Sequence, residues 1–302
     1  MQSAAWLFPG QGSQFVAMGR DLYAQDLATR ELFALASATT GLDLTTLCFE
    51  GPAATLQQTQ FAQPALLTVS VAFVRYLQHR GARADWVLGH SLGEYSALVA
   101  SGVLNFSDAI RIVQRRGALM AKAADGAMAA VLGLPEDIVC DLCNDAGGGV
   151  WPANFNAPRQ VVISGTLQAI QKVADLVKER GGGRLVPLRV GGAFHSPLMR
   201  TAAEGLRQTL SSASFYDAEI PVISTVDGQV HRCGEDFREL LEVQVIAPVL
   251  WTRSITTLLE LTHGPLLEVG PGSVLAGLVR QHDPGATVTS VGTVKAAKEL
   301  PL

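Results

Sequence analysis

The chain has 302 residues, 48% of them hydrophobic and 17% charged, which is typical of a soluble globular protein with one large domain or one domain carrying an insertion. Its formal net charge of −4, the lack of a dense Lys/Arg run and an aromatic content of 6% exclude the electrostatic footprint of a nucleic-acid-binding protein. An acidic partner would therefore have to meet a local basic patch.

The beginning of the chain carries no recognisable targeting signal. Residues 1–6 lack a basic segment and a long apolar run, and no later stretch reaches the roughly 18 apolar residues that a membrane span needs. The four cysteines suggest no disulfide framework for a chain of this length, which favours a reducing compartment. We therefore expect a cytoplasmic protein with no membrane partner.

Strand and helix patterns alternate in the first part of the chain. An apolar run at residues 4–8 predicts a buried strand, and residues 9–14 form a glycine-rich loop without the Lys or the third Gly of nucleotide-binding loops. Helical periodicity dominates residues 21–80, and a second short apolar run follows at residues 86–88. This order favours an α/β fold with a mostly parallel sheet.

The second strand leads directly into Gly89-His90-Ser91-Leu92-Gly93, after which a helical pattern begins. A Gly-x-Ser-x-Gly motif between a strand and a helix is typical of a nucleophile elbow, because the two glycines allow a sharp turn that exposes the serine. The N-terminus of the following helix would stabilise negative charge that develops beside the hydroxyl. The context indicates acyl transfer by Ser91, although so short a motif also occurs by chance.

Residues 108–122 predict an amphipathic helix with one unusual charge. Arg116 shares the apolar stripe of Val113 and Met120, whereas Arg111 and Arg115 share the solvated face. A guanidinium cannot lose its charge, so one that points inward needs an anion. Two interpretations stay open: an internal salt bridge or a stem lying along the surface, and the binding of a substrate carboxylate.

Residues 126–192 predict a small domain inserted into the larger sheet domain, which takes residues 1–125 and 193–302. Its strands are expected at 127–132, 150–155, 160–164 and 184–190, and its helices at 135–144 and 167–180. This βαββαβ order is that of a ferredoxin-like module.

Two features of the small domain bear on function. Residues 154–157 are expected on the loop between its central strands, where they, with Asn154 and Asn156 among them, either face the cleft between the domains or simply form a turn. Cys140 and Cys143 are spaced as neighbours on a helix, which favours core packing over a metal or redox site.

The chain then returns to the large domain. Helices are expected at 198–213, 236–245, 251–261 and 274–280, and strands at 220–225, 266–269 and 287–291.

Ser91 needs a base, and histidine is the usual one because its pKa lies near the working pH. Among the six histidines, His90 adjoins Ser91 but would point to the opposite face of the strand, and four others lie in polar or turn-like stretches. His195 lies in an apolar segment that glycines precede, and Pro197 restricts the backbone just after it. No carboxylate between Ser91 and His195 ends a predicted strand, and Asp227 comes in the wrong order for a hydrolase triad. A Ser-His dyad with a main-chain carbonyl behind the imidazole is the more economical hypothesis.

These residues belong to a series of motifs that resembles the malonyl-CoA:acyl carrier protein transacylases, in order and at the family's spacing, from about residue 6 to residue 294. The resemblance implies a hydrolase-like α/β domain with a ferredoxin-like insertion. The motifs that carry it are residues 8–14, 60–65, 89–94, 116–117, 154–158, 192–197 and 268–272.

The resemblance also implies roles for single residues. Ser91 would be the nucleophile, His195 its base, and Arg116 the ligand of the malonyl carboxylate. The backbone N–H of Leu92, with the Gln11 loop, would form the oxyanion hole. The position of Gln244 matches the residue whose main-chain carbonyl orients the histidine. Leu92 and Phe194 match the malonyl pattern and would crowd a 2-methyl branch. Asn154 would line the substrate site.

The implied reaction is ping-pong transfer of malonyl from malonyl-CoA to the phosphopantetheine thiol of an acyl carrier protein, with no bound cofactor and no metal. The carrier is acidic in this family, so the exposed docking charges are expected at Arg115, Lys122, Arg189 and Arg200. Two alternatives stay open within the family: an acyltransferase that serves a polyketide pathway and the malonyl-transferring subunit of a malonate decarboxylase. A serine thioesterase or hydrolase is the more distant alternative.

Overall fold

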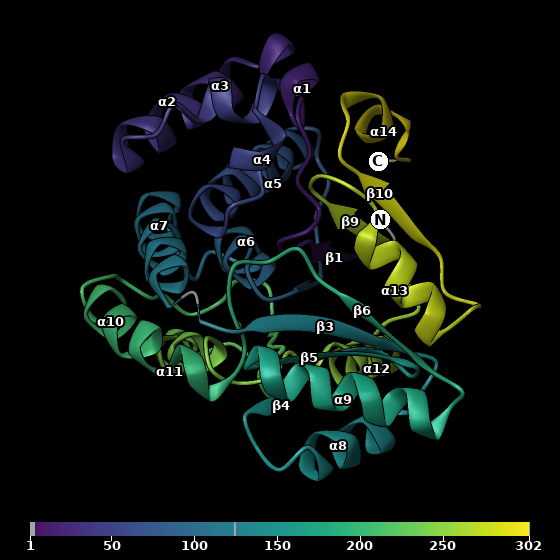
Figure 1. Ribbon diagram of the computed structural model, residues 1–302. Coiled ribbons are helices and arrows are strands. Elements are labelled where there is room, and N and C mark those ends of the chain that lie inside the picture. The colour runs from purple at the N-terminus through teal and green to yellow at the C-terminus, as the bar shows by residue number, and fades with distance from the viewer. Residues whose placement is uncertain (1–3, 124, 302) are drawn as a thin grey trace.

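The structure is a computed structural model that describes residues 4–123 and 125–301; residues 1–3, 124 and 302 of the predicted large domain lie outside this range. Its larger sheet has six strands in the order β10-β9-β1-β2-β7-β8. Strands β1, β9 and β10 of this sheet are labelled in Figure 1. All pairs are parallel except β7 with β8, which confirms the predicted α/β class. The strands are β1 (Ala5–Phe8), β2 (Trp86–Gly89), β7 (Val222–Ile223), β8 (Val230–His231), β9 (Leu266–Val269) and β10 (Val288–Val291).

Helices cover both faces of this sheet. Alternate side chains of β1 point to opposite faces, so Trp6 and Phe8 pack with the helices on one face while Ala5 and Leu7 pack with those on the other. The first group comprises α1 (Arg20–Gln25), α2 (Leu27–Thr40), α3 (Leu44–Phe49), α4 (Ala53–Leu56), α5 (Thr59–His79), α6 (Gly93–Ala100), α7 (Phe106–Lys122), α10 (Arg200–Ser211) and α11 (Gly234–Gln244). The second comprises α12 (Trp251–Leu261) and α13 (Val274–His282). The 3-10 turn η1 (Pro197–Met199) precedes α10, and α14 (Val294–Glu299) follows β10 and packs with the first group through Val294 and Ala297.

A second, antiparallel sheet has four strands in the order β4-β5-β3-β6 and is drawn in teal and green at the bottom of Figure 1. Its elements follow one another as β3 (Ala127–Leu132), α8 (Glu136–Asp145), β4 (Val150–Ala157), β5 (Gln160–Gly165), α9 (Leu167–Arg180) and β6 (Arg184–Pro187). This order confirms the predicted βαββαβ module. We propose residues 126–192 as the extent of the insertion.

The strand alternation of β3 explains how the small sheet is held. Ala129 and Val131 pack against α8 and α9, whereas Met128 and Ala130 belong to the core of the larger domain. The helices therefore cover only one face of the small sheet, and its other face lies on the larger domain.

The predicted bounds of three strands are wrong. The strand expected at 184–190 ends at Pro187, although the Leu188 N–H still donates to the Met128 main-chain oxygen at 2.9 Å. The strand expected at 220–225 is only Val222–Ile223, because Pro221 before it has no N–H to donate and Ser224 after it begins a turn, in which the Gly228 N–H donates to the Ser224 oxygen at 2.9 Å. Residues 154–157 belong to β4 and not to a loop, because β4 passes two β-bulges and also pairs with Val249 on its other edge. The sequence patterns also missed β8 and α14, which are short.

Within the described ranges, no helix has the length and apolar character to cross a bilayer.

Candidate active site

Ser91 lies at the tip of the turn that joins β2 to α6, with a positive φ of 51°. The turn is tight enough to demand both flanking glycines: a Cβ on Gly89 would lie 2.1 Å from the carbonyl carbon of Gly93, and a Cβ on Gly93 would lie 2.0 Å from the Phe8 carbonyl oxygen. A non-glycine residue with positive φ is strained, and such strain concentrates at functional sites. The backbone of residues 89–93 therefore forms the sharp strand-to-helix turn that the motif predicts.

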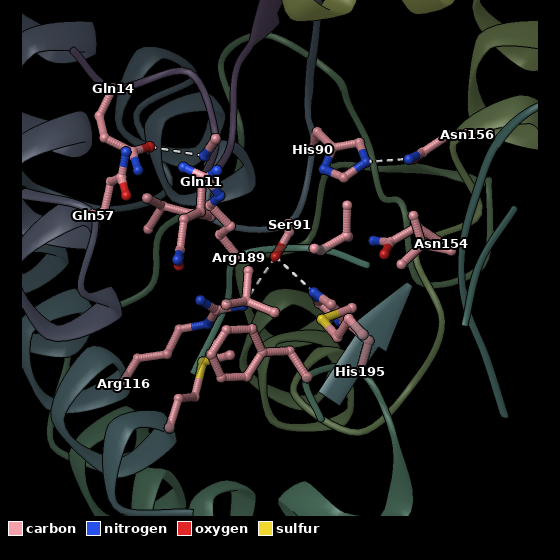
Figure 2. Close-up of a pocket in the computed structure, with 18 residues that line it drawn as sticks. Gln11, Gln14, Gln57, His90, Ser91, Arg116, Asn154, Asn156, Arg189 and His195 are labelled. Carbon is pink, nitrogen blue, oxygen red and sulfur yellow. Dashed lines mark hydrogen bonds between the residues drawn. The ribbon is translucent and has the colours of Figure 1, made fainter. Parts of the chain in front are cut away.

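The hydroxyl of Ser91 contacts the ring of His195. Ser91 Oγ lies 2.8 Å from His195 Nε2, while His195 Nδ1 lies 2.9 Å from the main-chain oxygen of Gln244 and 3.1 Å from that of Ala247. Carbonyl oxygens only accept hydrogen bonds, so Nδ1 carries the proton and Nε2 is free to accept the proton of Ser91 (Figure 2).

The two other candidates for this network lie elsewhere. The ring of His90 bonds the Asn156 side-chain oxygen at 2.8 Å, pointing away from the Ser91 hydroxyl (Figure 2). Asp227 pairs with His231 at 3.0 Å. The main-chain carbonyls therefore stand where a triad acid would be.

His195 is only 4% exposed, and its pKa is lowered to about 3. Burial is the main cause, because a charged imidazolium would lose its hydration, and the nearby positive charge of Arg116 adds to the effect. The ring is therefore neutral at physiological pH and able to act as a base.

Arg116 is 2% exposed and holds its guanidinium beside the nucleophile. Its Nη1 donates to Gln63 Oε1 at 2.8 Å, and its Nη2 donates to Gln244 Oε1 at 3.0 Å and to Ser91 Oγ at 3.2 Å. The guanidinium carbon also lies 5.6 Å from the centre of the Tyr95 ring.

All of these partners are neutral. In the described part of the chain no carboxylate forms a salt bridge with Arg116, so the internal ion pair is not found there. Its Nε has no hydrogen-bond partner. A buried cation with only neutral partners is a strong site for an incoming carboxylate.

A cavity of about 360 Å³ opens beside Ser91, Arg116 and His195. It lies between the two domains: Gln11, Gly12, Gln14, Gln57, Leu92, Met120 and Phe194 line it from the large domain, and Met128, Asn154, Asn156, Val162, Leu188, Arg189 and Val190 from the small domain or the segment after it. All of the site residues expected from the sequence line this cavity except Gln244, which lies beneath it. Asn156 belongs to the segment expected at the cleft and Gln14 to the motif of residues 8–14, but neither had a role predicted, and Gln57 was not predicted at all.

Two main-chain amides at the cavity are free to bind a ligand oxygen. Neither the Leu92 N–H nor the Gln11 N–H donates a hydrogen bond to another described residue. The side chain of Gln11 is anchored by Thr59 Oγ1, which donates to its Oε1 at 2.8 Å. No group of three or more metal-ligating side chains occurs among the described residues.

A family model described as the acyl transferase domain matches residues 5–300. The chain is also 45% identical over 287 residues to the malonyl CoA-acyl carrier protein transacylase of Bacillus subtilis, covering 93% of this chain and 90% of that protein. The chain belongs to the malonyl-CoA:acyl carrier protein transacylase family.

Solved structures of the transacylase family share the whole fold. The malonyl CoA-acyl carrier protein transacylase of Coxiella burnetii matches with a TM-score of 0.95 at 37% identity, covering 98% of this chain and 96% of that one. A malonyl-transacylase solved in complex with a type II PKS acyl-carrier protein matches with a TM-score of 0.94 at 38% identity, with 98% of both chains covered.

Proposed function

We propose that this chain transfers malonyl from malonyl-CoA to the phosphopantetheine thiol of an acyl carrier protein. Membership of the transacylase family supports the reaction class. The single observation that supports the donor is Arg116: a buried guanidinium with neutral partners, 3.2 Å from the nucleophile, suits an acyl group that ends in a carboxylate.

The first half-reaction forms a malonyl-serine ester. His195 Nε2 accepts the proton of Ser91 as Oγ attacks the thioester carbonyl carbon, and the Leu92 and Gln11 amides donate to the oxyanion that forms. The carbon–sulfur bond then breaks, and His195 returns the proton to the CoA sulfur.

The second half-reaction is the same sequence reversed. The phosphopantetheine thiol gives its proton to His195 and attacks the ester carbon, after which Ser91 Oγ leaves and recovers the proton. Arg116 holds the malonyl carboxylate throughout, so the acyl group keeps its position while the thiols exchange.

Selectivity among malonyl donors is proposed for Leu92 and Phe194, which are 1% and 5% exposed and line the cavity beside Ser91. A 2-methyl branch would have to displace them. Rejection of one methyl group amounts to about 1 to 3 kcal/mol, so we expect a preference for malonyl over methylmalonyl and not an absolute block. Asn154, which lines the opposite side of the cavity, is proposed to contact the pantetheine arm or the acyl group.

The acceptor is proposed to be an acyl carrier protein, since a related malonyl-transacylase was solved in complex with one. The family resemblance implies that this carrier is acidic. Arg115, Lys122, Arg189 and Arg200 are exposed, and Arg189 lines the cavity. Supply of malonyl units for fatty-acid synthesis is the proposed role, because the chain is more similar to the malonyl CoA-acyl carrier protein transacylase of Bacillus subtilis, at 45% identity, than to the malonyl-transacylase solved with a polyketide carrier, at 38%. The polyketide role remains the alternative, since that second relative also matches over nearly its whole length.

The fate of the acyl group tests the proposal against the hydrolase alternative. The protein is mixed with labelled malonyl-CoA with and without a phosphopantetheine-loaded carrier, and the label is followed on carrier and in free malonate. Initial rates with both substrates varied should give the parallel double-reciprocal lines of a ping-pong reaction. Release of malonate at the same rate without a carrier would replace the transferase proposal with a thioesterase.

A further inference from the structure

We infer that Glu94 is a positioning residue that acts through the side-chain amide of Gln244 to hold Arg116 ready for the substrate carboxylate. The inference depends on the proposed malonyl transfer. In this role Glu94 acts on the substrate site without contacting the substrate.

Gln244 connects the base and the carboxylate site through separate atoms. Its main-chain oxygen accepts from His195 Nδ1 at 2.9 Å, whereas its side-chain Oε1 accepts from Arg116 Nη2 at 3.0 Å. The side chain can supply that acceptor to Arg116 only in one of its two amide orientations, since the other presents an NH₂ group to the cation.

Glu94 sets this orientation. Gln244 Nε2 donates to Glu94 Oε2 at 2.7 Å and to the main-chain oxygen of Ser91 at 3.0 Å, so both atoms behind Gln244 are acceptors. Thr225 Oγ1 donates to the same Glu94 oxygen at 3.4 Å. If the Gln244 amide were flipped, its Oε1 would face the two acceptor oxygens of Glu94 and Ser91. Its NH₂ group would face the donor N–H groups of Arg116. Neither pair could form a hydrogen bond.

A helix-capping role does not account for Glu94. It lies in the first turn of α6, where an acidic side chain commonly faces the free amides of the helix, but α6 has no side-chain cap. Glu94 is instead fully buried, and its Oε1 has no hydrogen-bond partner in the described structure. Burial of a carboxyl costs free energy, and the contact of Oε2 with the Gln244 amide at 2.7 Å offsets part of that cost. Burial also raises the pKa of this carboxyl, and Oε2 accepts from Gln244 in either protonation state.

The consequence is a separation of two kinetic effects. Loss of the Glu94 acceptor lets the Gln244 amide rotate and weakens binding of the malonyl carboxylate at Arg116. The main-chain contact of Gln244 with His195 stays in place, so the base remains oriented. We expect the KM for malonyl-CoA to rise about tenfold while kcat changes much less.

The experiment compares Glu94→Met with Glu94→Gln. Met fills nearly the same volume without a strong acceptor, and exchange of a buried charged group for an apolar one of similar volume is often neutral for folding. Gln retains an acceptor oxygen. Steady-state KM and kcat for malonyl-CoA are measured for both, together with malonyl-ester formation on Ser91.

Glu268→Met is the matched control. Glu268 is equally buried, but its oxygens accept from the amides of Leu275 and Ala276 at the start of α13, away from the cavity. This variant is expected to lower the melting temperature without changing the KM for malonyl-CoA, which separates loss of a buried carboxyl from loss of this particular contact.

Three results support the inference together: a raised KM in Glu94→Met, a KM near the wild type in Glu94→Gln, and no further rise when Glu94→Met is added to Gln244→Ala. An unchanged KM in Glu94→Met, or a tenfold rise in Glu94→Gln, would overturn it. If Glu94→Met fails to fold, Glu94→Gln alone decides through its KM. Wild-type protein that forms no malonyl ester would instead refute the proposed function itself.

Discussion

Arg116 and Ser91 lie in hydrogen-bond contact, so the proposed carboxylate site and the proposed nucleophile occupy one region of the cavity. The distance of 3.2 Å between Nη2 and Oγ is short enough for an acyl group bound to the guanidinium to keep its carbonyl carbon near Oγ. In the proposed reaction, Arg116 therefore both selects the substrate and positions it for attack.

Removal of the Arg116 guanidinium tests this sharing. Arg116→Ala should lower the second-order rate constant for malonyl-ester formation about 100-fold, because hydrogen bonds to a charged group contribute about 1.5 to 3 kcal/mol each. Rapid-quench mass measurement gives the rate. Arg111→Ala, on the exposed side of the same helix, is the control and should leave it unchanged; equal losses in both variants would contradict a carboxylate role.

The pH dependence of malonyl-ester formation follows from the lowered pKa of His195. With a pKa of about 3, the ring stays neutral as the pH falls from 8 to 5 and the rate should stay nearly constant. A histidine at its ordinary pKa of about 6.5 would lose roughly 30-fold over this range. A rate that halves near pH 6.5 would show that His195 titrates normally.

The same shift affects stability. Between about pH 6.5 and pH 3 the unfolded chain binds a proton at His195 that the folded chain does not, so this residue makes the protein less stable as the pH falls through that window.

At the residue scale, the sequence predicted what depends on local pattern. The helical stripe placed Arg116 inward and the strand alternation turned His90 away from Ser91, because both follow from backbone periodicity. The contacts of Gln244 with Arg116 and Glu94 were not predictable, since they join residues 128 and 150 positions apart.

At the scale of elements, the β2–α6 turn is the part of the fold that tolerates least change. Gly89→Ala would place a Cβ 2.1 Å from backbone that cannot move independently, so we expect a loss of at least about 3 kcal/mol in the free energy of unfolding. Thermal or denaturant unfolding measures it.

Gly277→Ala is the control for that experiment. Gly277 lies within α13, and a Cβ there meets nothing within 4 Å, so alanine should raise stability by about 0.5 to 1 kcal/mol through its helix propensity. A Gly89→Ala variant as stable as the wild type would show that the elbow is not under steric constraint.

Element prediction succeeded where one periodicity dominates and failed where partners decide. β3 and β5 are short apolar runs and α7 carries a clear helical stripe, so both kinds of element are visible in the sequence. The bulged end of β4 was predicted as a loop, because its polar residues are held by pairing with β5 and with Val249, which lies far along the chain. Such long-range pairing leaves no local pattern.

At the scale of the whole molecule, the cavity opens between two domains and the proposed carrier must dock across that opening. Lys122→Glu and Arg200→Glu in combination should raise the KM for the carrier roughly tenfold, because they replace attraction with repulsion. Higher ionic strength should raise the KM for the carrier in the wild type, because salt screens the attraction between exposed charges. Lys178→Glu combined with Arg180→Glu is the matched control: it makes the same total charge change on α9, which covers the face of the small sheet opposite the cleft. Equal KM values for the carrier in all of these variants would exclude this docking surface.

The most direct test of the central claim is the intact mass of the protein after brief mixing with malonyl-CoA, for the wild type and Ser91→Ala. We predict an increase by one malonyl group in the wild type, no increase in Ser91→Ala, and loss of the adduct when loaded carrier protein is added. An adduct that persists in Ser91→Ala, or a wild type that acquires none, would contradict transfer through a malonyl ester on Ser91.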